Sequence, residues 1–246
     1  MARILQEWYS YFIRCQIKYN IMKKIGFNQH YGLHDAVVVT ETKTKTRRME
    51  KCLDALYKTE EELGEPLVIK QQVITLDGIV IKTNAGLMAL HTNYVIDDEV
   101  AVKLSGKDIY RHLQQRYGDS SDAALGFKEM YQGMTFWTNK MFTPADLCLD
   151  KVLITGIRVE RLQDISDEDC LREGIYKDEN GRTIGYPFGV PFYYTFYGAV
   201  NKDKKQLHWT FPREAFSVLI DKPGVGGKGT WKRNPWVVVY TFKLVK

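Results

Sequence analysis

With 246 residues, the chain is long enough to bury a full hydrophobic core in one or two domains, and its 44% hydrophobic and 26% charged residues exclude a disordered or low-complexity protein. The net charge of +5 favours a polyanionic partner such as RNA or DNA only slightly, because many proteins of other functions are equally basic. No run of about 18 uncharged apolar residues occurs, which excludes a transmembrane helix. The 4 cysteines are dispersed and lack the C-x-x-C spacing of a zinc knuckle or a redox motif.

The first predicted element is a helix within residues 1–21, where apolar residues recur at spacings near three and four. Charged residues interrupt this segment, so it lacks the apolar core of a signal peptide, and we expect a cytoplasmic protein. Met22, followed by two lysines, is a second candidate start. Residues 1–21 are therefore predicted to be either a packing helix or an extension upstream of the main domain, residues 22–246.

The segments that follow predict both helices and strands. The β-branched run 36–40 fits a buried strand or the end of a helix, and the polar segment Glu41–Arg48 comes after it. A charged helix is predicted over 47–63, and a β-hairpin over 67–83 with Asp77-Gly78 at its turn.

The middle of the chain predicts a strand, a helix and a loop. An acidic turn and a strand are predicted over 94–102, a short helix over 107–117 and a flexible surface loop over 118–133. Apolar alternation then predicts a strand over 151–160.

The C-terminal third predicts two helices and a last strand. Ser166 and Asp169 resemble a capping box, so a helix is expected over 167–173. A proline in its first turn favours a second helix over 212–220, and a strand closes the chain over 236–245. Strands with peripheral helices predict an α+β fold built on a small closed or nearly closed β-barrel.

Four segments carry motifs in a fixed order. They are Thr42–Arg48 (TKTKTRR), Tyr94–Val102 (YVIDDEVAV), Ile154–Ile175 (ITGIRVERLQDISDEDCLREGI) and Trp231–Phe242 (WKRNPWVVVYTF). Together they resemble the ASCH domain family, relatives of the PUA RNA-binding domains that are common in bacterial genomes and tailed phages.

This resemblance implies a PUA-like small β-barrel with peripheral helices, in which residues 50–93 and 176–210 are insertions that the minimal domain lacks. It also implies a phage or prophage setting. The sequence departs from the family pattern at two glycines. The glycine before the lysine motif is replaced by Glu41 or Thr42, and the Gly-Asp of the second motif is Asp97-Asp98.

Some small ASCH proteins are acetylcytidine amidohydrolases, in which a lysine, a threonine three residues later and a later glutamate form the active site. The resemblance places these catalytic roles on Lys43, Thr46 and Glu173. A partly desolvated lysine can take the proton of a threonine hydroxyl, and the glutamate can pass a proton to the leaving amine or bind the base edge. In a regular strand Lys43 and Thr46 would point to opposite faces, so they can meet only across a turn or bulge.

The same residues also fit interpretations in which they have no binding or catalytic role. The lysine segment equally fits a solvated basic edge, since runs of charge are usually solvated, and Glu173 fits a surface carboxylate at a helix end.

A second function needs no catalysis. Basic side chains can contact a phosphate backbone while a tryptophan stacks on a base. The nucleic-acid-binding candidates are Lys45, Arg47, Arg48, Arg158, Arg161 and Trp231. Arg158 and Arg161 also fit ion pairs with Glu160 or Asp164.

We therefore predict RNA or nucleotide binding through a PUA-like pocket. The alternatives are a hydrolase of modified nucleosides or a ribonuclease that uses Lys43, Thr46 and Glu173, and a module that contacts an unidentified protein through the aromatic run 192–197. We expect no membrane partner.

Two further patterns indicate no cofactor and no metal. His30 and His34 are four residues apart but lack an H-E-x-x-H context, and the glycine-rich run 223–229 lacks the spacing of a phosphate-binding loop.

Overall fold

The computed structural model describes residues 22–178 and 193–245, so the helix predicted within residues 1–21 lies outside the described residues. The chain combines helices with several sheets, which confirms the α+β class. Its described residues divide into two compact units, one formed by residues 22–26 with 99–151 and the other by residues 27–98 with 152–178 and 193–245. Across the described ranges, no helix combines the length and the apolar character needed to cross a membrane.

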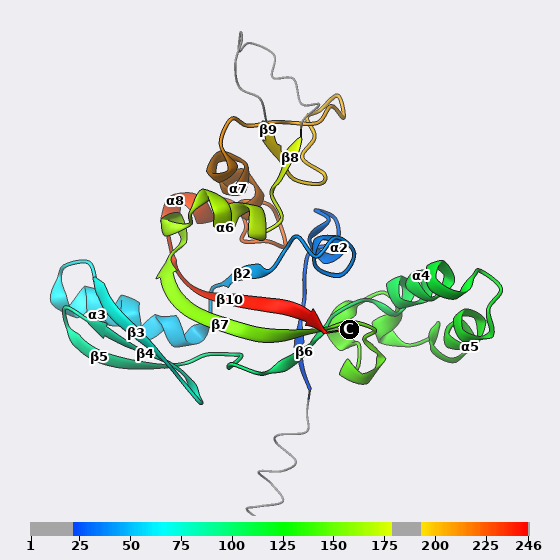
Figure 1. Ribbon diagram of the computed structural model, residues 1–246, viewed down its shortest axis with the longest axis horizontal. Coiled ribbons are helices and arrows are strands. Elements are labelled where there is room, and N and C mark those ends of the chain that lie inside the picture. The colour runs from blue at the N-terminus through cyan, green and yellow to red at the C-terminus, as the bar shows by residue number, and fades with distance from the viewer. Residues whose placement is uncertain (1–21, 179–192, 246) are drawn as a thin grey trace, which may run out of the picture. The chain divides into compact units, whose positions relative to one another are not determined.

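The first unit contains a parallel strand pair and a helical hairpin, and Figure 1 shows the two helices of the hairpin in green. Strand β1 pairs with β6 so that Ile25 faces Val102. A small core lies between the helices, where Leu104, Ile109 and Ala124 are buried. The elements of this unit are β1 (Lys23–Ile25), β6 (Glu99–Val102), α4 (Gly106–Tyr117), α5 (Asp122–Tyr131) and the 3-10 turns η2 (Thr135–Trp137), η3 (Lys140–Phe142) and η4 (Ala145–Leu147).

Helix α5 corrects one prediction, because residues 118–133 were expected to form a loop. Ser121 caps this helix by accepting a hydrogen bond from the Ala124 backbone nitrogen, and Phe127 packs against the small core. The segment was predicted as a loop because it is polar and contains glycines. Its short amphipathic helix is stabilised by packing on α4.

The second unit is built around the long strands β7 (Lys151–Arg161) and β10 (Trp236–Val245), with the short strand β2 (Lys45–Arg48) beside β10. The first five residues of β10 are all buried, as expected for a continuous apolar run covered on both faces. Strand β2 is antiparallel to β10, and Thr46 lies opposite Tyr240. As far as the described residues go, these strands form an open sheet and no closed barrel.

Helices gather at one end of β7 and β10 in Figure 1. Helix α6 lies against α7, and α8 follows a glycine-rich loop. The helical elements of this unit are α2 (Leu33–Val38), η1 (Lys51–Leu53), α3 (Asp54–Leu63), η5 (Leu162–Asp164), α6 (Asp167–Arg172), α7 (Pro212–Ile220) and α8 (Thr230–Arg233). The run 36–40 is therefore the end of a helix, the second of the two predicted alternatives.

The segment 50–93 contains the predicted hairpin, extended by a third strand. Strands β3 (Ile69–Thr75), β4 (Gly78–Thr83) and β5 (Gly86–His91) form an antiparallel sheet. The side-chain amide of Gln72 attaches this sheet to β7, because it both donates to the Val159 carbonyl and accepts from the Val159 backbone nitrogen, at 2.8 Å each.

The described part of segment 176–210 forms a two-stranded sheet, β8 (Tyr176–Asp178) with β9 (Tyr193–Thr195). The Phe196 ring stacks on Trp209 at 5.6 Å, and Phe196 is fully buried. The Phe196 ring also meets the Tyr31 ring edge-on at 6.1 Å, and this contact attaches the segment to the rest of the second unit.

Candidate functional site

Buried ionic side chains concentrate where β2 faces α6. We call this group the β2–α6 charge cluster. Its members are Lys43, Lys45, Arg47, Arg158, Glu160, Asp169 and Glu173.

Arg47 is the centre of this cluster. Its Nη1 lies 2.9 Å from Glu173 Oε1, and its Nη2 lies 2.6 Å from Glu160 Oε1 and 3.1 Å from Asp169 Oδ2. Attraction to Glu173 and Glu160 raises the pKa of Arg47 although burial acts to lower it. Lys45 points to the same face of β2 and pairs with Asp169, because side chains two positions apart in a strand share a face.

Lys43 lies just before β2, and its side chain is 2% exposed. The amine donates to Glu173 Oε2 at 2.6 Å, to the Glu173 carbonyl at 3.0 Å and to the Lys45 carbonyl at 2.7 Å. All three donors of the ammonium are thus occupied. Burial lowers the pKa of Lys43, although the neighbouring Glu173 carboxylate acts to raise it.

Helix α6 positions the two carboxylates that face β2. Ser166 caps the helix by accepting a hydrogen bond from the Asp169 backbone nitrogen at 3.1 Å. Glu173 follows the last helical residue, and Gly174 then adopts φ 107, where an added Cβ would approach Leu33 Cδ2 to 2.6 Å. A short capped helix with a glycine stop therefore fixes both acids.

Burying charged side chains costs desolvation energy, and ion pairing does little more than compensate for this cost. The cluster is therefore weak evidence that these residues stabilise the fold. Clusters that perturb pKa values are common at functional sites. Asp169 illustrates the effect: burial acts to raise its pKa, but hydrogen bonds from Lys45 and Arg158 outweigh this and lower the pKa to about 2.

The structure brings two of the three predicted catalytic residues into contact and places the third on the other face of the strand. Lys43 and Glu173 are in direct contact. Thr46 alternates with Lys45 and Arg47 along β2, so its side chain points to the other face of the strand. The Lys43 amine nevertheless reaches the carbonyl of Lys45, the group that is bonded to the Thr46 nitrogen, because Lys43 precedes the strand and folds back along it.

The expected solvated basic edge is wrong for Lys45 and Arg47, which are buried and paired with carboxylates. Their charges are neutralised inside the protein, which leaves them poorly placed for phosphate. Arg158 pairs with Glu160, as one alternative predicted, and also with Asp169, which was not predicted. Arg161 pairs with Glu60 rather than Asp164, and its guanidinium lies 4.1 Å from the Trp236 ring.

Arg48 and Trp231 complete the nucleic-acid-binding candidates. The Arg48 guanidinium and the Lys43 amine each lie 5.7 Å from the centre of the Phe27 ring. Trp231 is half-buried in the wall of a surface hollow, described next.

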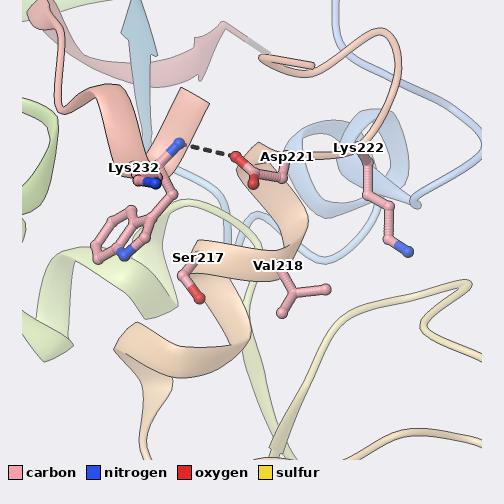
Figure 2. Close-up of a pocket in the computed structure, with 6 residues that line it drawn as sticks. Ser217, Val218, Asp221, Lys222 and Lys232 are labelled. Carbon is pink, nitrogen blue, oxygen red and sulfur yellow. Dashed lines mark hydrogen bonds between the residues drawn. The ribbon is translucent and has the colours of Figure 1, made fainter. Parts of the chain in front are cut away.

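Two adjoining hollows of about 450 Å³ and 330 Å³ lie at α7 and α8, on different elements from Lys43. Both are lined by Ser217 and Trp231. Figure 2 shows Ser217, Val218 and Asp221 on one side of the smaller hollow and Lys232 on the other.

Sequence reasoning missed Glu160 and Asp169 as members of the site. Asp169 was noted only for its place in a capping box, and Glu160 only as an ion-pair partner. Neither residue type nor spacing signals their role, because the contacts with Arg47 span more than 110 residues.

The aromatic run 192–197 gives little surface for a protein partner. Phe192 lies outside the described residues, whereas Thr195 and Phe196 are buried. Tyr197 is 64% exposed. The described part of this run therefore mainly packs inward.

The two positions at which the sequence lacks an expected glycine share a backbone feature. Glu41 has φ 53 and Asp97 has φ 65, both in the left-handed region that glycine favours. The loops thus keep a conformation that a glycine would adopt without strain.

Comparison with known proteins gives no match: no family model, no curated protein and no solved structure is similar to this chain.

Proposed function

We propose that this chain has an ASCH-like, PUA-related core and that the β2–α6 charge cluster forms the floor of a pocket for a nucleotide or a nucleotide unit of RNA. The positive φ values of Glu41 and Asp97 support the resemblance, since they fall at positions where the family has glycine. In this proposal the open sheet of the second unit corresponds to the PUA-like small barrel, and residues 50–93 and 176–210 are its two insertions.

The contact between Lys43 and Glu173 carries the proposal. A buried amine and a buried carboxylate, 2.6 Å apart, hold each other in a fixed orientation, and a bound base would replace one of the internal hydrogen bonds that they now make. The exposed edge of an unpaired base presents donors and acceptors in the same way, and proteins read it by such hydrogen bonds. The cluster also has one more cation than carboxylates, which favours an anionic ligand over a cationic one.

Calorimetric titration with cytidine, cytidine monophosphate and a short single-stranded RNA tests this pocket. Lys43→Ala is expected to lower the affinity for cytidine and cytidine monophosphate at least about tenfold, because hydrogen bonds to charged groups contribute about 1.5–3 kcal/mol each. Lys51→Ala, an exposed lysine of η1, is the matched control. Unchanged affinity in a Lys43→Ala protein with a normal circular dichroism spectrum would overturn the pocket.

Hydrolysis of an acylated nucleoside is the second candidate, favoured by the lowered pKa of Lys43 and its contact with Glu173. This step requires the Thr46 hydroxyl, which points to the other face of β2, to turn toward Lys43. The neutral Lys43 amine would then take the proton of Thr46 Oγ1 as this oxygen attacks the acetyl carbonyl carbon. The bond from that carbon to the base amine then breaks, and Glu173 relays the proton from Lys43 to the leaving amine. Water finally cleaves the acetyl ester of Thr46 and releases acetate.

Acetate release from acetylcytidine separates the two candidates. Hydrolysis predicts product with the unmodified protein and at least about a hundredfold slower release with Thr46→Val, which keeps the side-chain shape but removes the hydroxyl. Thr42→Val, at an exposed threonine four residues earlier, is the control. Nucleoside binding without any acetate release would leave a binding protein.

A further inference from the structure

The hollows at α7 and α8 form a surface that neither the charge cluster nor the hydrolysis step uses. We call it the α7–α8 groove. Its aromatic, basic and small lining residues are Phe211, Arg213, Ser217, Val218, Lys222, Trp231 and Lys232, and its acidic lining residues are Asp167, Glu214 and Asp221.

An aromatic side chain is held firmly in this groove. The Trp231 ring lies 5.6 Å from the Arg213 guanidinium and meets the Phe216 ring edge-on at 6.2 Å. Its backbone is fixed as well, because the Trp231 nitrogen donates to Asp221 at 2.8 Å and its carbonyl accepts from Gln163 at 2.7 Å. The half-exposed indole is thus preorganised and loses little freedom when another ring stacks on it.

A second aromatic ring lies at the same groove. Phe211 precedes the first residue of α7 and is 57% exposed, although a phenyl ring gains by burial. Two aromatic side chains in one open groove are the usual arrangement for stacking successive bases of a single strand.

The charges around the groove favour a polyanion. Basic residues outnumber acidic residues in the segment 212–234, and still do so when Asp167, which lines the groove from α6, is counted. The basic residues are Arg213, Lys222, Lys228, Lys232 and Arg233. None of these five pairs with an acidic side chain among residues 22–178 and 193–245.

The two acids of the same segment are occupied by backbone groups. Asp221 accepts from the backbone nitrogens of Gly229 and Trp231. Glu214 accepts from the Phe211 backbone nitrogen at the start of α7. Hydrogen bonding to peptide groups draws these carboxylates toward the protein and leaves the lysines to face solvent.

We propose that the α7–α8 groove binds single-stranded nucleic acid, with a base stacked on Trp231 and the phosphates contacted by Lys222 and Lys232. This inference goes beyond the nucleotide pocket, because it concerns different residues and requires no chemistry. Stacking tolerates any base, and lysines contact phosphate as point charges, so the groove is expected to bind strands with little sequence preference.

Fluorescence anisotropy with labelled 12-nucleotide RNA and DNA single strands, and a duplex of equal length, tests the groove. Trp231→Ala is expected to weaken single-strand binding at least about fivefold, in the range measured for lost base stacking. Trp231→Phe retains a stacking ring and is expected to recover most of the affinity, which a purely structural role in folding would not require. Tyr197→Ala removes an exposed ring elsewhere and is expected to change nothing.

The charge contribution is tested by Lys232→Glu, with Lys58→Glu on α3 as a control that makes the same charge change at another exposed lysine. Loss of one phosphate contact is expected to lower the slope of log affinity against log salt by about one. Equal weakening by both variants, binding of the duplex as tight as that of the single strands, or displacement of RNA by polyglutamate would overturn the proposal.

Lys43→Ala separates this inference from the nucleotide pocket. Single-strand binding at the groove is expected to survive that substitution, whereas binding of free cytidine monophosphate at the charge cluster is expected to be lost. RNA affinity that depends on Lys43 and not on Trp231 would contradict the groove and support the pocket.

Discussion

The amine of Lys43 lies 2.6 Å from a carboxylate oxygen of Glu173, a residue 130 positions later in the chain. Glu173 also accepts from Arg47 through its other oxygen, at 2.9 Å. One carboxylate therefore pairs with two buried cations, and the segment around β2 depends in part on Glu173 for its charge balance.

Glu173→Gln is expected to destabilise the protein by about 3 kcal/mol, because it leaves the buried cations of Lys43 and Arg47 without this counter-charge. Urea unfolding followed by circular dichroism measures the change. Glu168→Gln is the control, since Glu168 is on α6, is 71% exposed and pairs with Arg172 at the surface. Equal unfolding midpoints for the two variants would show that the cluster does not depend on this charge.

Stability is expected to fall steeply in acid because of Asp169. Its pKa is lowered to about 2 in the folded protein, whereas an aspartate in an unfolded chain titrates at about 3.9. The stabilisation is therefore complete above pH ~4 and is lost as the pH falls from about 4 to about 2. Unfolding free energies measured across this range should fall less steeply for Asp169→Asn, and parallel curves for the two proteins would contradict the assignment.

If Lys43 acts as a base, acetate release is expected to increase with pH. Only the neutral amine can take the proton of Thr46, and burial lowers the pKa of Lys43 below that of a free lysine, about 10.4. The rate should rise to a plateau whose midpoint lies below that value. A rate that does not change between pH 6 and pH 10 would exclude Lys43 as the base.

Loss of the α6 cap is expected to act on the site as well as on stability. Ser166→Ala removes the acceptor for the Asp169 backbone nitrogen, at a cost of about 1 kcal/mol. Chemical denaturation measures the loss, and Ser120→Ala, at an exposed serine of the first unit, should be neutral. If the Ser166 variant is as stable as the unmodified protein, the cap does not hold α6 in place.

Gln72→Ala is expected to release the three-stranded sheet from β7. The Val159 backbone nitrogen and carbonyl would each lose a partner, which costs about 1–3 kcal/mol for a buried group. Hydrogen exchange should accelerate at the Val159 amide, because local opening becomes easier there. Gln71→Ala is the neighbouring control, and unchanged protection at Val159 would show that other contacts hold the sheet.

Much of the local structure followed from the sequence. The turn at Asp77-Gly78, the caps of α6 and the limits of α7 and β10 are set by residues within a few positions of one another, so propensity and spacing predict them. Helix α5 was missed because its apolar face becomes stable only against α4. Helix α8 is too short to give any periodic signal.

By itself the sequence determined the α+β class, the order of most elements and the special character of the segment around Lys43. Only the tertiary structure decided that Lys45 and Arg47 are buried among carboxylates rather than solvated, and that Trp231 lies in a groove with exposed lysines. The physical reason is the distance in sequence over which each effect acts. Capping and turn formation involve residues a few positions apart, whereas the charge state and the exposure of a side chain depend on neighbours that can be more than a hundred residues away in the chain.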